Sequence, residues 1–508
     1  MDDMRSLGAH NAFRSLQSVF GYPAGAPQMT WLEIPTKAGP RTAHPFLLPH
    51  EFFNSYHTHK KEDWLSTMAR STEACIEFWR GMRQSAFLKN HPSLPASSWG
   101  STIPIGFHGD AGAFSKQDSL YTISWNSLIG AGKTAEKRFV FTVLRKGELV
   151  AETLDCVFRI LGWSFNSMLC GEFPSKNYYG RPASVTGPLA NGWRGAVCQA
   201  RGDWAFYTEV FKFPAWNCAE TMCWMCRASS TIKDLAFSNF APRSGWRRTR
   251  WTHESYLAHL RGLGLAIPAL LICIIGFRLE CVAIDTLHTV DQGVASHIIG
   301  NVFWLIAVKK KAFGGSTQDQ QIKNLDSHLR KWYQATKTRK RSMVQGKLTK
   351  ERIKTSKDWP KLKCKAAATR HLSGYAVHLM NMYGTPEDQP VRALCQLLHR
   401  FYEILNEESQ CFSPSANAEM ASLGSKLCII YSGLSSKYLA DRERFFKMMP
   451  KLHLFDHLCS WQASEIGNPR SYWTYADEDL VGLLVECAQS CHVKTLAASA
   501  IFKWLHVY

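Results

Sequence analysis

The sequence predicts an α/β protein whose mixed sheet core is interrupted by a large, mainly α-helical insertion. Between residues 102 and 203 the apolar pattern reads as strand, strand, strand, helix, strand. Apolar residues at helical spacing dominate residues 391–405 and 420–431. An apolar fraction of 45% suits a globular core. We expect an N-terminal helical or irregular region of unknown role at 1–97, the first half of the core at 98–205, the insertion at 206–445 and the C-terminal part of the core at 446–508.

The first predicted strand ends on an acidic residue in Ile103-Pro-Ile-Gly-Phe-His-Gly-Asp110. Glycines at 109 and 112 let the backbone turn beside this carboxylate. An aspartate at the end of a buried strand is costly unless a partner compensates its charge. A metal ion, a helix N-terminus or an arginine can be that partner, and this stretch alone does not separate them.

The following elements bring a second aspartate into the same pattern. Alternating residues predict strands at 121–125 and 137–144, and apolar spacing predicts a helix from Leu154 to Leu169 that Gly171 stops. The next short strand, from Trp193, ends on Asp203. If the first and fourth strands lie side by side, Asp110 and Asp203 meet, and a divalent metal is the usual remedy for their repulsion.

The net charge of the chain indicates which class of binding partner to expect. The formal charge of +19 and a pI near 9.3 favour a polyanion, most simply nucleic acid, with an anionic membrane surface as the competing interpretation. The longest apolar run, Leu263 to Phe277, is interrupted by Pro268 and is too short for a confident membrane span. We expect a buried element there and no membrane partner.

Two basic segments of the insertion suit phosphate contact. The first mixes arginine, which pairs with phosphate, and tryptophan, which stacks on bases: Arg243, Trp246, Arg247, Arg248 and Arg250. The second, within residues 308–365, is predicted as a solvated arm that includes Lys337, Arg339, Lys340 and Arg341. Solvated loops without a ligand are the alternative for both.

Three further patterns can carry chemistry or structure. Cys223-Trp-Met-Cys226 offers two thiolates for zinc, or two buried structural cysteines. Asp285-Thr-Leu-His288 places a histidine one helical turn after an acid that can instead be a helix N-cap. Asp477, Glu478 and Asp479 open a predicted helix, where capping alone explains one or two acids.

Taken in order, these residues resemble the catalytic part of a cut-and-paste DNA transposase of the DDE class, nearest to CACTA-like and related superfamilies. The four motifs that carry the resemblance are His108-Gly-Asp110-Ala-Gly, Arg201-Gly-Asp203-Trp with the later Cys223-x-x-Cys226, Asp285-Thr-Leu-His288, and Pro450-Lys-Leu-His453-Leu-Phe-Asp456-His457. The resemblance covers roughly residues 98–490 and implies an RNase H-like core split by a helical insertion.

The resemblance implies two-metal chemistry with Mg²⁺ or Mn²⁺, in which Asp110 and Asp203 hold the ions and a third acid completes the site. Glu478 is the expected third acid, with Asp479 and Asp477 next. His288 is expected near the scissile phosphate, and Zn²⁺ at Cys223 and Cys226, with His288 as a further ligand. Transposon ends and target DNA, a homo-oligomer and a nuclear location complete what the resemblance implies.

Two other functions remain open from the sequence. The chain can be an inactive, transposase-derived DNA-binding protein, in which the three acids need not converge. It can also be an RNase H-like nuclease without a strand-transfer step. Convergence of the acids separates the first from the enzymes, and joining of a cut end to a new target separates the second from a transposase.

Overall fold

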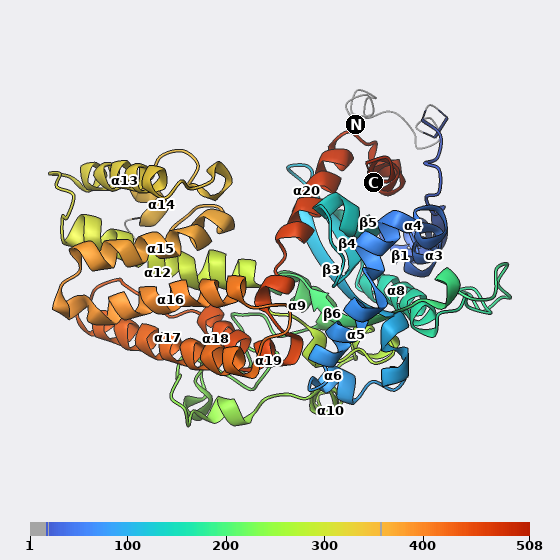
Figure 1. The fold of residues 1–508 in the computed structure, drawn as a ribbon, viewed down its shortest axis with the longest axis horizontal. Helices are drawn as coiled ribbons and strands as arrows, with labels where there is room; N and C mark the ends of the chain where they lie inside the picture. The colour runs from blue at the N-terminus through green and yellow to red at the C-terminus, as the bar shows by residue number, and fades with distance from the viewer. Residues whose placement is uncertain (1–16, 19, 356–357, 508) are drawn as a thin grey trace. The chain divides into compact units, whose positions relative to one another are not determined.

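The computed structural model describes residues 17–18, 20–355 and 358–507, and its fold divides into two compact units (Figure 1). Unit 1 comprises Met1–Phe213, Thr252–Ala283 and Thr474–Tyr508, and unit 2 comprises Pro214–Trp251 and Ile284–Trp473. The chain therefore leaves unit 1 twice and returns to it twice. Residues 252–283, expected in the insertion, lie in unit 1, and residues 446–473, expected in the core, lie in unit 2.

Unit 1 contains a mixed four-stranded sheet in the order β5-β4-β3-β6. Strands β3 and β4 pair antiparallel, as do β4 and β5, whereas β6 runs parallel to β3. The strands are β3 (Thr102–Ala113), β4 (Ser119–Ser127), β5 (Phe139–Arg145) and β6 (Arg194–Arg201). A parallel fourth strand needs a crossover, which α8 (Thr153–Cys170) supplies. The predicted order of strands and helix is confirmed, as is the stop at Gly171, whose φ of 70° ends α8.

Helices cover both faces of this sheet. Phe107 of β3 packs on Phe158 and Phe165 of α8. On the opposite face, Gly112 leaves room for α20 (Tyr475–Gln489), since a Cβ there would lie 2.7 Å from Val485 and 2.9 Å from Val481. Unit 1 also contains α9 (Trp204–Phe211), α10 (His253–Gly262), α11 (Leu270–Cys273) and α21 (Leu496–Leu505).

The N-terminal region is not only helical and irregular, as the sequence predicted. A hairpin of β1 (Thr30–Thr36) and β2 (Gly39–Phe46) precedes its helices. Prolines at 35, 40 and 45 hid the strand pattern, and they are tolerated because an isolated two-stranded sheet has only edge strands. The helices are α3 (Pro49–His59), α4 (Lys61–Trp64), α5 (Thr72–Gly81) and α6 (Ala86–Lys89), with the short α7 (Thr134–Lys137) later in the unit. Residues 1–16 lie outside the described part.

A backbone contact extends the sheet edge beyond β6. Val282 forms a parallel bridge with Ala200, and the Ala283 amide donates to the Ala200 carbonyl at 2.9 Å. Tyr207 of α9 donates to the Ala283 carbonyl at 2.5 Å. Residues 282–283 therefore lie beside β6, directly before the chain enters the second segment of unit 2.

Unit 2 is built from stacked helices (Figure 1). They are α12 (Ser296–Trp304), α13 (Gln318–Ala335), α14 (Lys350–Ile353), α15 (Ala366–Tyr383), α16 (Gln389–Glu407), α17 (Pro414–Ala440), α18 (Pro450–His457) and α19 (Ala463–Ile466). The predicted helix at 391–405 is confirmed. Helix α17 continues through Gly433, the predicted stop, because a mid-helix glycine costs only about 1 kcal/mol.

Two other expectations need correction. The basic tract is not a solvated arm: it contains α13, and Val344, Leu348 and Ile353 are buried. Lys357 of that tract lies outside the described residues.

The apolar run at 263–277 is only partly buried, since Leu263, Leu265 and Ile272 are exposed. Within the described residues, no helix combines the length and the apolar character needed to cross a membrane.

Candidate active site and metal centre

Asp110 and Asp203 occupy matched positions relative to the two parallel strands. The last paired residues of β3 and β6 are His108 and Arg201; Asp110 follows His108 by two residues, and Asp203 follows Arg201 by two. The predicted strand end at Asp110 is wrong, since β3 continues to Ala113, and β6 ends at Arg201, two residues before Asp203. Side chains two residues apart share a face of a strand, so Asp110 belongs to the sheet face that α20 covers. Both aspartates are half-buried.

Close backbone packing brings these two chain segments together. A Cβ on Gly202 would lie 3.0 Å from the Gly109 carbonyl oxygen, and Phe206 occupies the space beside both glycines. Burial first, and then the charges of Glu209, Asp203 and Asp110, raise the pKa of the Tyr121 hydroxyl well above its usual value. The close packing at Gly109 and Gly202 therefore brings the two aspartate-bearing segments together.

One oxygen of each aspartate is used locally. The Ala111 amide donates to Asp110 Oδ1 at 2.7 Å, and the Phe206 amide donates to Asp203 Oδ1 at 2.7 Å, so that Asp203 caps α9. These bonds hold the carboxylates in place. They satisfy the N-cap interpretation of Asp203 without excluding a cation at the other oxygen.

Helix α20 brings the predicted third acid toward the same face. The charge of His108 acts on Asp477, while Val481 and Val485 pack over Gly112, so α20 runs along β3 in the strand's direction. Glu478 precedes Val481 by three residues and Val485 by seven, which puts all three on one stripe of the helix. Asp110 lies between His108 and Gly112 on the strand. The geometry therefore favours Glu478 as the third acid: it is half-buried and lies beside the part of β3 that carries Asp110, whereas Asp479 is exposed.

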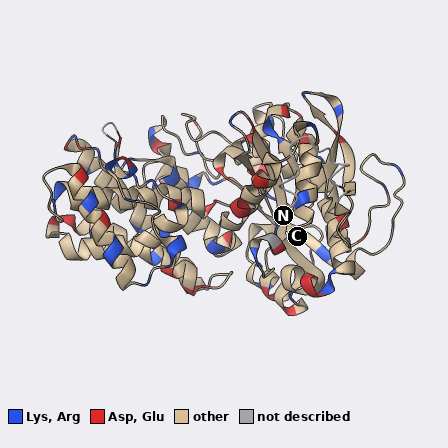
Figure 2. Cartoon of the chain, turned by 90° about the horizontal axis from the view of Figure 1, so that it is seen from above, with Lys and Arg blue, Asp and Glu red and all other residues tan. Residues whose placement is uncertain are grey.

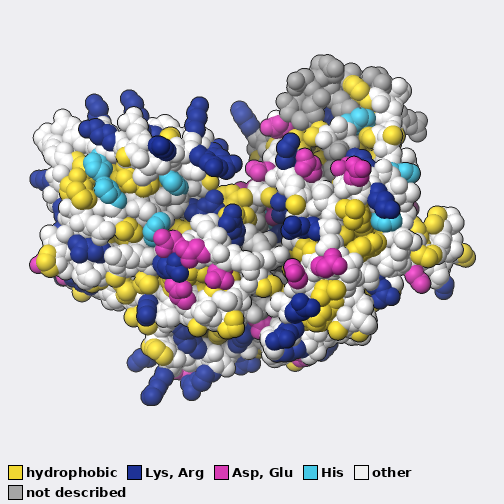
Figure 3. Space-filling model, viewed as in Figure 1, with side chains coloured by type: hydrophobic (Ala, Val, Ile, Leu, Met, Phe, Trp, Pro, Cys, Tyr) yellow, Lys and Arg dark blue, Asp and Glu magenta, His cyan; other side chains and the backbone are white. Residues whose placement is uncertain are grey.

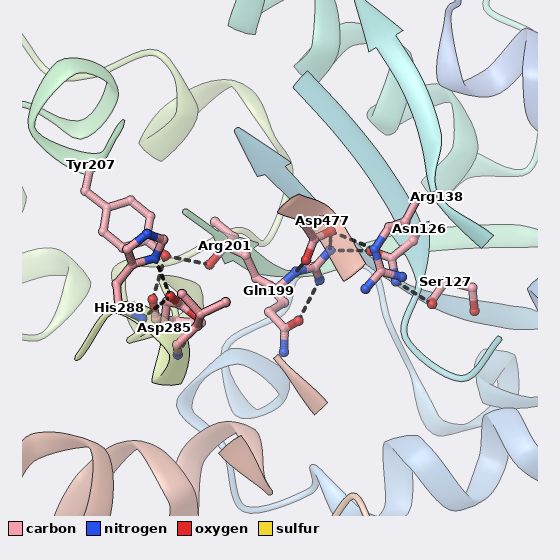
Figure 4. Close-up of polar contacts among 12 residues, drawn as sticks. Asn126, Ser127, Arg138, Gln199, Arg201, Tyr207, Asp285, His288 and Asp477 are labelled. Carbon is pink, nitrogen blue, oxygen red and sulfur yellow. Dashed lines mark hydrogen bonds and ion pairs between the residues drawn. The ribbon is translucent and has the colours of Figure 1, made fainter. Parts of the chain in front are cut away.

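Asp477, the remaining acid, has a different role. It is fully buried and pairs with Arg138 Nε at 2.6 Å and with Arg201 Nε at 3.1 Å (Figure 4). Burial alone would raise the pKa of Asp477, but the charges of Arg138, Arg201 and His108 hold it below its usual value. Arg201 also contacts Asn126 and donates to Gln199 at 2.8 Å. Asp477 is therefore an ion-pair partner that fixes the start of α20 on the sheet.

A buried layer of polar residues lies on the sheet face beneath the acids. Thr122 and Ser124 of β4 face Asp110 and His108 in the register. Both are buried, and their hydroxyl oxygens have no hydrogen-bond partner among the described residues. Most sheet faces under a helix are apolar, so this polar layer is the exception that accompanies the carboxylates.

A second cluster forms within unit 2 from Cys223, Cys226, His453 and His457. One ligand atom from each lies within 4.8 Å of all the others, and all four residues are buried. Cys226 Sγ is 3.3 Å from Nε2 of each histidine. Zinc bonds of about 2.0–2.3 Å put ligand atoms about 3.5 Å apart in a tetrahedron. The donor set and its spacing therefore fit Zn²⁺.

The protonation of this cluster suits a metal. Burial opposes ionisation of Cys223, but hydrogen bonds from Cys226, His453 and His457 hold the pKa of its thiol well below the usual value. Burial and then the charge of His453 lower the pKa of His457. A thiolate and a neutral imidazole are the forms that bind zinc.

Aromatic and ionic contacts hold the histidines in place. Trp246 packs against His453 with ring centroids 4.4 Å apart, and Trp461 stacks on His457 at 4.1 Å. Arg247 lies over Trp246 at 4.4 Å and pairs with the buried Asp456 at 2.6 Å. Trp246 is fully buried, so its ring supports the cluster and presents no surface for a base.

The remaining basic candidates divide by exposure. Arg250 pairs with Glu465 at 3.4 Å and lies over Trp461. The exposed members are Arg243, Arg248, Lys337, Arg339, Lys340 and Arg341. Figure 2 shows basic and acidic positions interspersed along the helices of unit 2, and Figure 3 shows lysine and arginine side chains gathered along the edge that carries α13 and α14.

Asp285 and His288 interact with each other instead of with the cysteines. His288 Nδ1 is 2.7 Å from Asp285 Oδ2, which also accepts from the His288 amide at 2.8 Å (Figure 4). The Leu287 amide donates to Asp285 Oδ1 at 3.1 Å, so the carboxylate binds the first turn of the π-helical segment Leu287–Ala295. The expectation that His288 completes the cysteine site is not met, because His453 and His457 take those positions.

Sequence reasoning noted His453 and His457 on one helical face but did not assign them as ligands. It also missed Arg138 and Arg201 as partners of Asp477. The sequence signal that could have identified the two histidines as ligands was the presence of His-x-x-x-His together with Cys-x-x-Cys. No comparable signal marks the two arginines. A comparison of the sequence with models of known protein families, and another with curated proteins, gave no match.

Proposed function

We propose that this chain is a transposon-derived DNA transposase of the DDE class, which cleaves phosphodiester bonds and transfers strands at element ends. The observation that carries the proposal is the matched position of Asp110 and Asp203, each two residues beyond the last paired residue of two adjacent parallel strands, with the helix that bears Glu478 packed on β3. The sheet order, the parallel fourth strand and the helical segment between β6 and α20 support an RNase H-like core with an insertion.

The donor chemistry of the acids suits hard divalent cations. Asp110, Asp203 and Glu478 are half-buried residues that offer carboxylate oxygens, which Mg²⁺ and Mn²⁺ prefer. Among the described residues, these oxygens do not all lie within the 4.8 Å that defines the cysteine–histidine group. Two ions about 3.5–4 Å apart need a wider ring of ligands than one tetrahedral ion. Bound there, the ions would activate the attacking oxygen and stabilise the leaving oxygen of the phosphodiester.

The chain's own residues orient these ligands. Arg201 precedes Asp203 by two residues, His108 precedes Asp110 by two, and Asp477 precedes Glu478 by one. The buried Arg201–Asp477 pair thus ties the segment that carries Asp203 to the helix that carries Glu478, and β6 pairs with the strand that carries Asp110. Cys223, Cys226, His453 and His457 form a closed set of four ligands, which is typical of a structural zinc site.

The test is nicking of supercoiled plasmid in Mg²⁺ or Mn²⁺, followed by joining of an oligonucleotide with a free 3′-hydroxyl to a second duplex. Asp110→Asn, Asp203→Asn and Glu478→Gln should each reduce nicking by at least about 10³-fold, while the matched control Asp479→Asn leaves it within about twofold.

Each outcome separates the candidates. Nicking that survives Asp110→Asn rules out the proposed site. DNA binding without metal-dependent nicking by the unaltered chain favours an inactive DNA-binding protein. Nicking without joining favours a nuclease.

A further inference from the structure

A cavity in unit 2, outside both clusters, is lined by four lysines and a histidine together with Ile353, Thr355, Asp358 and Trp359. Its volume is about 200 Å³, and its walls include His297, Lys354, Trp359, Lys361, Lys363 and Lys447. Ligand pockets for drug-sized molecules usually measure roughly 300–1,000 Å³. This cavity is therefore the size for a small charged group, such as one or two phosphates, and too small for a whole nucleotide.

The backbone around the cavity is built to bring these lysines together. The Lys361 amide donates to the Ile353 carbonyl at 2.7 Å, and the Lys363 amide donates to the Arg352 carbonyl at 2.8 Å. A Cβ on Gly300 would lie 2.6–2.8 Å from backbone atoms of Lys361 and Leu362, so only glycine allows this close approach to α12.

One asparagine joins the two segments that carry the lysines. Asn301 Oδ1 accepts from the Phe446 amide at 2.9 Å, and its Nδ2 is 3.4 Å from the Pro360 carbonyl. The Lys447 carbonyl in turn accepts from the Tyr431 hydroxyl at 2.9 Å. These contacts hold Lys361 and Lys447, which are far apart in sequence, at one cavity.

The positive charge of the four lysines in the cavity exceeds the charge of Asp358, the one acid among the described residues that line it. Among the described residues, Lys361, Lys363 and Lys447 form no ion pair. Asp358 also lines the cavity and accepts from Thr355 at 2.8 Å, while Glu443 is engaged by Lys309 at 2.5 Å. Burial, then the charges of Lys363 and Lys447, lower the pKa of Lys361.

His297 also lines the cavity, and its side chain is buried. Its Nδ1 has no hydrogen-bond partner among the described residues, which is a costly arrangement for a buried polar atom. Burial, and then the charges of Lys361, Lys447 and Lys451, lower the pKa of His297 to about 3, so the ring adds no charge to the cavity at pH 7.

We propose that this cavity binds a phosphate group, held by Lys361, Lys363 and Lys447. The phosphate comes either from a DNA backbone or from a free phosphoanion. Binding of a DNA phosphate rests on the proposed function. Binding of a free inorganic phosphate does not, because it needs no catalytic acid. Trp359 carries Lys447 at 5.4 Å and Arg444 at 5.5 Å over its ring, which keeps these cations at the cavity wall.

The experiment is calorimetric titration of the full chain with inorganic pyrophosphate. The unaltered chain should bind, and Lys361→Gln with Lys447→Gln should weaken binding by about tenfold or more, since charge-assisted contacts are lost. The control pair Lys331→Gln and Lys426→Gln removes equal charge from exposed sites of the same unit and should change affinity less than about twofold. If the double variant does not fold, the two single variants carry the same comparison.

A parallel titration with a 20-base-pair duplex identifies the source. Competition by pyrophosphate, with weaker duplex binding in the cavity variant than in the control, supports a DNA phosphate. Unchanged duplex binding with lost pyrophosphate binding supports a free phosphoanion. Absence of pyrophosphate binding by the unaltered chain, or equal binding by the cavity variant, overturns the proposal. Loss of nicking plays no part in this readout, so failure of the proposed function is distinguishable.

Discussion

The proposed carboxylate site of unit 1 and the cysteine–histidine cluster of unit 2 would hold a metal in opposite ways. The cluster is fully buried, its four ligand atoms are within 4.8 Å of one another, and aromatic rings pack around it. Asp110, Asp203 and Glu478 are half-buried, and their support is a separate layer of buried ions. In general a closed set of ligands suits a structural metal, whereas an open set leaves room for a substrate.

The largest effect should follow removal of a ligand from the buried cluster. His457→Ala should abolish bound zinc and lower the free energy of unfolding of the chain by about 5 kcal/mol or more, since binding of a structural zinc is also folding energy. Metal analysis and denaturant unfolding check this. Cys218→Ser, an exposed cysteine in the same segment, is the control and should change neither. A protein that purifies without metal and unfolds like His457→Ala would contradict the structural role.

A smaller but still large effect should follow removal of the ion that supports the carboxylates. Asp477→Asn should lower the free energy of unfolding by about 3–5 kcal/mol at pH 7, because it leaves two buried guanidinium groups without a counter-charge. The pKa of Asp477 is lowered in the folded state, so its stabilisation is present above its unfolded pKa of about 3.9 and is lost as pH falls through the folded value.

The difference in free energy of unfolding between Asp477→Asn and the unaltered chain should therefore become smaller below about pH 4. Denaturant unfolding at several pH values measures this difference. Asp479→Asn, one step along the same helix but exposed, should stay within about 0.5 kcal/mol of the unaltered chain. A constant gap down to pH 2 would show that Asp477 acts through packing alone.

The smallest effect concerns the polar layer itself. Thr122→Val replaces a buried hydroxyl that lacks a hydrogen-bond partner by a methyl group of similar shape. The change should be neutral or stabilise the chain by up to about 1 kcal/mol. Thermal unfolding detects it, with Thr142→Val as the control, because the Thr142 hydroxyl donates to the Pro45 carbonyl and its loss should destabilise. Equal destabilisation by both would mean that Thr122 has a partner after all.

Local patterns revealed the strands and most of the long helices but not which residues meet. The apolar pattern of the sequence located β3 and β6, and it thereby drew attention to Asp110 and Asp203. Cys226 and His457 are separated by 231 residues, and no local rule states that such motifs touch. Helical phase limits the third acid to one of three neighbours, but choosing Glu478 needs the contact of Val481 with Gly112. Asp477 was invisible as an ion-pair partner because Arg138 lies 339 residues earlier.

The order of segments in the chain has a consequence for synthesis on the ribosome. Strands β3–β6 emerge before residue 213, yet the carboxylate that neutralises Arg138 and Arg201 lies at 477, after all of unit 2. Because domains fold from the N-terminus as they emerge, the nascent sheet carries two arginines without their counter-ion until α20 is made. Two of the three acids are then present without the third. A ribosome-bound chain is thus held in an incomplete state, and the proposed site is assembled only after residue 478 has emerged.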